Sequence, residues 1–151
     1  MGFDIYGLAA RSKKGEYFRN NVWWWRPLAE YVLGRVDVPR EEARHWDSND
    51  RQEVSARTAL LIADTLDRLI ASGETARYER EYRRQLKALP LQECDVCGGS
   101  GERHDEIVDG RCNGCDGRGQ VKNWSCHYPF SVENVREFAE FCRESGGFQI
   151  C

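Results

Sequence analysis

The spacing of apolar side chains predicts two neighbouring helices in the middle of the chain. In residues 55–71, Ser55 is a suitable N-cap, and Ser72-Gly73 supplies a stop after the last turn. Six apolar residues of this segment share one helical stripe: Ala59, Ile62, Ala63, Leu66, Leu69 and Ile70. Residues 74–89 form a second helical segment, which is charged on most faces and ends at Pro90.

Two more helices are expected nearer the ends of the chain. Proline is tolerated in the first turn of a helix, so Pro27 places one helix at about residues 25–33, with Asn20-Asn21 as turn or cap residues before it. Ser131 is the expected cap of the last helix, and Gly146-Gly147 ends it.

Short strands are expected at both ends. Residues 3–8 begin with alternating apolar and polar positions, and residues 148–151 form a second short apolar segment, so we expect the two to pair. Residues 9–15 and 36–50 are polar or rich in charge and are interpreted as loops, the second with a short turn near residues 40–46.

Residues 94–119 contain the pattern C-x-x-C-x-G-x-G twice. Its cysteines are Cys94, Cys97, Cys112 and Cys115. The interval between the two pairs is close to that of zinc sites, and four thiolates complete a tetrahedron without leaving a position for water. The spacing therefore predicts one structural zinc ion. Glycine permits the positive φ values of a chain that curls round a metal: Gly99, Gly101, Gly117 and Gly119.

Redox-active dithiols are the alternative interpretation of these cysteine pairs. Redox pairs usually begin a helix after a strand, and the glycines that follow each pair here would break such a helix. His104 and His127 are close enough in sequence to be spare ligands, although four cysteines do not require them. We also expect a turn at Asp109-Gly110, between the two pairs.

The repeated pattern resembles the cysteine-rich domain of DnaJ-type co-chaperones. Those proteins carry four such modules and bind two zinc ions, so two modules imply one zinc ion here. The resemblance covers residues 94–119, and the chain has no His-Pro-Asp tripeptide typical of a J-domain. The metal assignment carries over, whereas the chaperone activity does not follow.

The fold class expected from these elements is α+β, as a mostly helical single domain with a small pairing of terminal strands. Residues 1–90 are expected to form the helical part and residues 91–124 a zinc-stapled excursion. Residues 125–151 then return as a helix and a strand that pack on the helical part.

Consecutive aromatic residues mark one candidate partner surface. Trp23, Trp24 and Trp25 precede Arg26, and three consecutive side chains cannot all point one way on a helix or a strand. Packing in the core is one interpretation. The other is a protein-binding surface, because Trp, Tyr and Arg dominate interface hot spots; base stacking is a third.

A basic helical face is the other candidate surface. Its residues recur at helical spacing: Arg77, Arg80, Arg84 and Lys87. Such a face could contact phosphates, or it could be a solvated helix with local ion pairs such as Glu79–Arg83.

Charge and composition narrow the range of functions and cellular locations to expect. The 151 residues carry a formal net charge of −3, without the basic excess typical of nucleic-acid binders. An acid at Asp4 stands where a signal peptide has basic residues, and no apolar run is long enough to span a membrane, so we expect a cytoplasmic protein with reduced thiols. No small-molecule substrate is evident from the motifs.

Most of the chain resembles small uncharacterised bacteriophage and prophage proteins. The matching strings are YFRNNVWWWRPL, LIASGE, CNGC-x-G-x-G and FCRESGGFQIC. The resemblance implies an accessory role in the bacterial host cytoplasm through binding of a protein, with inhibition of a host defence component as one form of it. The alternatives are a nucleic-acid-binding accessory factor and an enzyme whose site is not visible in the sequence.

Overall fold

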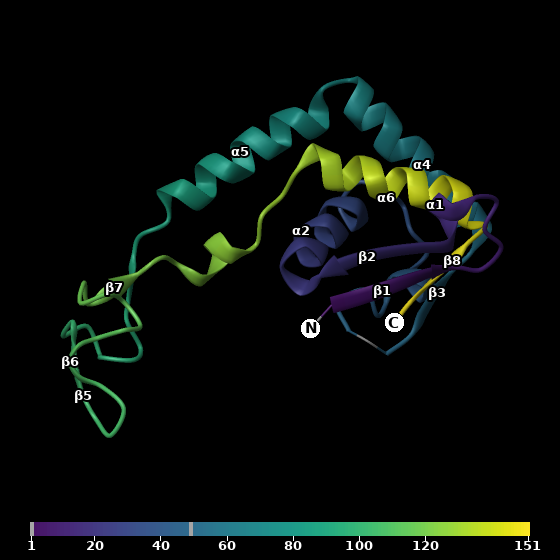
Figure 1. Ribbon diagram of the computed structural model, residues 1–151. Coiled ribbons are helices and arrows are strands. Elements are labelled where there is room, and N and C mark those ends of the chain that lie inside the picture. Colours follow the sequence, from purple (N-terminus) through teal and green to yellow (C-terminus); the bar gives the residue numbers. More distant parts are fainter. Residues whose placement is uncertain (1, 49) are drawn as a thin grey trace. The chain divides into compact units, whose positions relative to one another are not determined.

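A computed structural model describes residues 2–48 and 50–151 (Figure 1). The chain forms two compact units. Unit 1 comprises Met1–Arg83 and Tyr128–Cys151, and unit 2 comprises Arg84–His127. The α+β class expected from the sequence is confirmed. Within the described residues, no helix combines the length and apolar character needed to cross a lipid bilayer.

Unit 1 contains a four-stranded antiparallel sheet. Its strands are β1 (Gly2–Gly7), β2 (Tyr17–Asn21), β3 (Gln52–Val54) and β8 (Phe148–Ile150), in the order β2-β1-β8-β3. The expected pairing of the terminal strands is confirmed, with Ile5 opposite Ile150. Phe3 and Ile5 are buried, whereas Tyr6 is exposed, as period-two alternation requires.

Six helices accompany the strands in the described residues. They are α1 (Lys13–Glu16), α2 (Val22–Leu33), α3 (Arg40–Ala43), α4 (Ala56–Ala71), α5 (Glu74–Ala88) and α6 (Val132–Ser145). The Ser55 and Ser131 side chains accept the N–H groups of Thr58 and Asn134, as expected of N-caps. Gly146 ends α6 in the left-handed conformation, with φ +65°.

Aromatic side chains fill the core of unit 1. Trp25 is fully buried, its ring centroid lies 5.5 Å from that of Phe3, and its indole N–H donates to the Trp46 carbonyl. Phe138 of α6 packs edge-on against Trp25 at 5.7 Å and against Phe148 at 5.8 Å. Figure 1 shows α2 and α6 on one side of the sheet. The contacts of Trp25 with Phe3 and of Phe138 with Phe148 join these helices to the strands.

The beginning of α2 differs from the prediction. The helix starts at Val22 rather than near Trp25, because Asn21 accepts the N–H groups of Trp23 and Trp24 and caps it there. Pro27 consequently lies beyond the first turn. The residues just before the cap form β2, where Phe18 is buried.

Three other short elements were not predicted as such. The segment interpreted as a polar loop contains α1, and the segment after residue 36 contains α3 as its short turn. Strand β3 has three residues, too few for a visible alternation. It is defined by pairing with β8, in which Val54 lies opposite Phe148.

Unit 2 contains two small hairpin ladders and one 3-10 turn. Strand β4 (Gln92–Glu93) pairs with β7 (Gln120–Val121), β5 (Glu102–His104) pairs with β6 (Asp109–Arg111), and η1 (Trp124–His127) follows. The predicted turn at Asp109-Gly110 is wrong, because these residues belong to β6. The chain turns earlier, where the Asp105 side chain accepts the N–H groups of Ile107 and Val108.

Candidate metal centre

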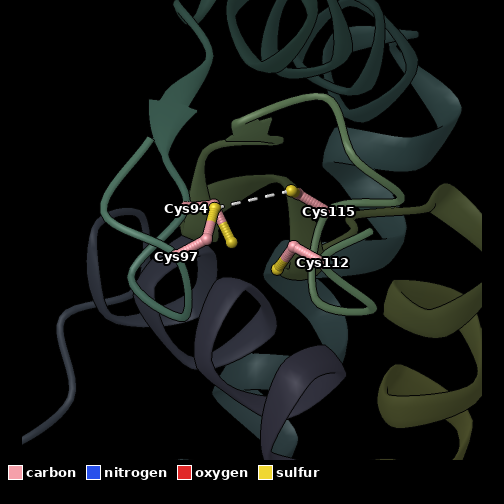
Figure 2. Close-up of side chains that lie close together, drawn as sticks. All are labelled: Cys94, Cys97, Cys112 and Cys115. Atoms are coloured by element: carbon pink, nitrogen blue, oxygen red, sulfur yellow. Dashed lines mark hydrogen bonds between the residues drawn. The ribbon is translucent and has the colours of Figure 1, made fainter. Parts of the chain in front are cut away.

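Four cysteines meet in unit 2, two from each C-x-x-C module. The Sγ atoms of Cys94, Cys97, Cys112 and Cys115 all lie within 4.8 Å of one another. Figure 2 shows their side chains gathered round one point from two separate turns. Cys94, Cys112 and Cys115 are buried and Cys97 is half-buried. The structure therefore brings together the set that the spacing predicted, in a position to hold one metal ion.

The two modules hold each other through reciprocal backbone hydrogen bonds. The N–H of Cys94 donates to the Gly119 carbonyl at 2.9 Å, and the N–H of Cys112 donates to the Gly101 carbonyl, also at 2.9 Å. In both bonds, the first cysteine of one module contacts the last glycine of the other. The ladders follow the same rule, since each pairs the strand entering one module with the strand leaving the other.

Two glycines also orient sulfur atoms within their own modules. The N–H of Gly101 donates to Cys97 Sγ at 3.3 Å, and the N–H of Gly119 donates to Cys115 Sγ at 3.2 Å. Both glycines have positive φ, +80° and +72°. A Cβ on Gly119 would lie 2.2 Å from the Gly99 carbonyl oxygen. Glycine is therefore required there both by the backbone conformation and by the close approach of the two modules.

The thiols of the cluster differ in acidity. Burial raises the pKa of Cys94 to about 11. Burial acts in the same direction on Cys97, but hydrogen bonds from the Gly101 N–H and from neighbouring thiols outweigh it and lower the pKa to about 7. A thiol with this pKa is partly ionised at neutral pH, and a bound cation would favour ionisation of the others.

The surroundings of the cluster fit a closed metal site. Backbone N–H groups point at two of the sulfurs, and such donors stabilise thiolate charge. The residues after Cys97 and after Cys115 form turns, whereas the redox alternative calls for a helix there. With four sulfur donors, a tetrahedral ion would have no open coordination position.

Neither histidine proposed as a spare ligand belongs to the cluster. His104 lies in β5, where its Nδ1 is 2.5 Å from the Asp109 carboxylate and its Nε2 is 3.7 Å from Glu102. The hydrogen bond with Asp109 raises the pKa of His104. The His127 ring packs against Trp124, with centroids 5.2 Å apart.

The three consecutive tryptophans have different environments. Trp25 is buried in the core, whereas Trp23 and Trp24 are half-buried and Arg26 is exposed. The Trp23 ring packs against Tyr128 at 5.0 Å, and the Arg26 guanidinium lies 3.3 Å from the Tyr128 hydroxyl. The sequence did not single out Tyr128, because it is more than a hundred positions away from these residues.

The basic face lies on α5. Its four residues are all exposed: Arg77, Arg80, Arg84 and Lys87. On another face of the helix, Tyr78 and Tyr82 pack against Phe130. The Glu79 carboxylate contacts Arg83 at 2.5 Å and accepts the Val132 N–H at 3.3 Å.

Comparison with known proteins finds no match to this chain among family models, curated sequences or solved structures. The function of this chain is therefore inferred from its own geometry.

Proposed function

We propose that this chain is a binding protein whose unit 2 is held together by one structural zinc ion. The observation that carries the proposal is the cluster of four cysteine Sγ atoms within 4.8 Å of one another. The partner that we favour is another protein, and the resemblance to phage proteins suggests an accessory role of that kind in a bacterial host.

Zinc suits this donor set better than the other common divalent ions. Thiolates are soft ligands, which bind zinc well, whereas magnesium and calcium take oxygen ligands. In a site with four sulfur ligands, zinc supplies folding free energy and no catalysis. The Cys94, Cys97, Cys112 and Cys115 thiolates would hold it, and the resemblance to DnaJ-type modules supports the same assignment.

Metal content tests this part of the proposal. Protein purified without added metal should contain about one equivalent of zinc, and Cys97→Ser should lose it. Cys142→Ser is the matched control, because Cys142 is a buried cysteine of α6 outside the cluster. A wild-type protein that lacks metal but keeps unit 2 folded would contradict the proposal.

A surface of unit 1 has the composition of a protein-binding hot spot. Trp23 and Arg26 both contact Tyr128, and these three residue types dominate such sites. Tyr, Trp and Arg are also enriched in interfaces relative to the rest of a protein surface. The mild net charge of −3 argues against a partner recognised mainly through charge.

Paired variants test this surface. Wild-type protein, Trp23→Ala and Leu61→Ala would be used as baits in a host lysate, with bound proteins quantified by mass spectrometry. Leu61 is the matched control, because it is an exposed apolar residue of α4. A specific partner should be depleted at least about 30-fold by Trp23→Ala, the equivalent of a hot-spot loss of about 2 kcal/mol. Equal recovery on all three baits would refute this location.

Nucleic-acid binding is the second candidate, and the exposed cations of α5 favour it. Arg77 and Arg80 are both exposed on the basic face. Phosphate contacts give affinity that falls steeply with salt. An electrophoretic shift assay with salt titration should then show a smaller salt slope for Arg77→Gln. Absence of a shift at low salt would eliminate this candidate.

A further inference from the structure

Unit 2 has a groove beside the metal centre, with a volume of about 1000 Å³. It lies along the β4–β7 ladder. Residues of both strands and residues next to them in the sequence line it. Three large apolar side chains line it and remain largely exposed, with exposed fractions of 58% for Leu91, 51% for Val96 and 59% for Trp124. The zinc modules therefore carry a concave, partly apolar surface of their own.

Unit 2 cannot bury these side chains internally. Its buried cluster consists of the four cysteines with Val121 packed against them, and it includes none of these three side chains. Three large apolar groups around one groove differ from apolar residues scattered singly over a surface, and such grouping marks interaction sites. An occupant of the groove would gain burial against all three.

The charges around the groove select the class of occupant. Its lining includes two acids from the chain around the first Cys pair, Glu93 and Asp95, and two cations from the chain around the second, Arg118 and Lys122. Arg118 is positioned by its Nε, which donates to the Cys115 carbonyl at 3.0 Å. Two acids in the groove would repel a chain of phosphates. A polypeptide, which can carry both signs of charge beside an apolar side chain, is complementary to a lining that contains both acids and cations.

We propose that this groove binds a short segment of a partner polypeptide. The segment carries a large apolar side chain that contacts Leu91, Val96 and Trp124. An acidic residue of the segment faces Arg118 and Lys122. This inference rests on the proposed zinc-stabilised fold of unit 2, and it adds a binding site distinct from the Trp23 surface of unit 1.

Peptide selection on the zinc-loaded full-length protein tests the groove. A displayed library of random dodecapeptides would be selected on wild-type protein and counter-selected on Trp124→Ala. We expect enrichment of peptides with one large apolar residue and a neighbouring acid. By fluorescence anisotropy, Val96→Ser and Trp124→Ala should each weaken the selected peptide at least tenfold, and Lys122→Glu should weaken it unless the acid of the peptide is changed to lysine.

Ile107→Ser is the matched control, because Ile107 is 80% exposed in the turn of the β5–β6 hairpin and does not line the groove. It should change the affinity less than twofold. The charge swap with Lys122→Glu keeps the test decisive if an apolar variant fails to fold.

Three results would overturn the inference. They are failure to enrich any peptide, an affinity that the groove variants do not change, and displacement of the peptide by a single-stranded oligothymidine that binds more tightly. Zinc content measured on the same samples distinguishes failure of the groove proposal from failure of the proposed metal site. Wild-type protein without zinc refutes the metal site, whereas zinc-loaded protein with no groove-dependent binding refutes the groove alone.

Discussion

Gly119→Ala should weaken zinc binding strongly, although it alters no ligand. A Cβ at this position would lie 2.2 Å from the Gly99 carbonyl oxygen, and real Cβ contacts are essentially never below 3.0 Å. The two modules would have to separate by about 0.8 Å or more, because the contact is with backbone rather than with a flexible side chain. The same movement strains the bonds from Cys94 to Gly119 and from Gly119 to Cys115 Sγ.

The expected magnitude combines two contributions. Holding alanine in the left-handed region costs roughly 1–2 kcal/mol. Disturbing hydrogen bonds that orient metal ligands typically costs about 10–100-fold in affinity, which corresponds to about 1.4–2.8 kcal/mol. We therefore expect Gly119→Ala to bind zinc about 10–100-fold more weakly than a variant in which alanine has a positive φ but makes no close contact.

Gly98→Ala is that control variant. Gly98 has φ +56°, and a Cβ there would have no atom within 4 Å. The equivalent position of the second module is Asp116, with φ +53°, so a side chain is accepted there. Competition against a chelator of known zinc affinity would compare the two variants. Equal losses in Gly98→Ala and Gly119→Ala would refute the argument from close approach.

Three further predictions concern stability and pH. Cys112→Ser should remove hydrogen-exchange protection from unit 2 and leave that of α4 intact, because structural zinc supplies the folding free energy of its own site. Trp25→Ala should lower the free energy of unfolding of unit 1 by about 3–5 kcal/mol in chemical denaturation, because its ring is fully buried. The pKa of His104 is raised by Asp109, so this pair stabilises the β5–β6 hairpin fully below the ordinary histidine pKa and progressively less as pH rises through the raised value. An NMR titration should show the raised pKa in wild type and a lower one in Asp109→Asn.

The sequence predicted correctly the elements that depend on residues close to one another in the chain. Ser55 and Ser131 cap helices because a hydroxyl followed by an apolar stripe satisfies free N–H groups within the same segment. Each C-x-x-C pair forms its own turn, as the spacing predicted, and backbone hydrogen bonds between the two modules bring the pairs together. Glycines with positive φ follow both pairs.

The elements that depend on distant partners could not be predicted. Strand β3 exists through pairing with β8, and the contact of Tyr128 with Trp23 joins residues far apart in the chain. Two local signals competed in the hairpin of unit 2. The Asp-Gly pair favours a turn, but the Asp105 side chain already closes one four residues earlier.

Unit 2 is inserted in the sequence between Arg83 and Tyr128 of unit 1, and this connectivity links metal binding to chain entropy. The Tyr82 hydroxyl donates to the Tyr128 carbonyl at 2.9 Å, so folding of unit 1 closes a loop of 44 residues, 84–127. When metal holds unit 2 folded, pairing of Gln92 with Val121 reduces the segments that close the loop to residues 84–91 and 122–127. A roughly threefold shorter loop costs about 1 kcal/mol less to close. Metal loading should therefore stabilise unit 1 by about this amount through the connectivity of the chain alone, and the folding of unit 1 should tighten metal binding by the same factor.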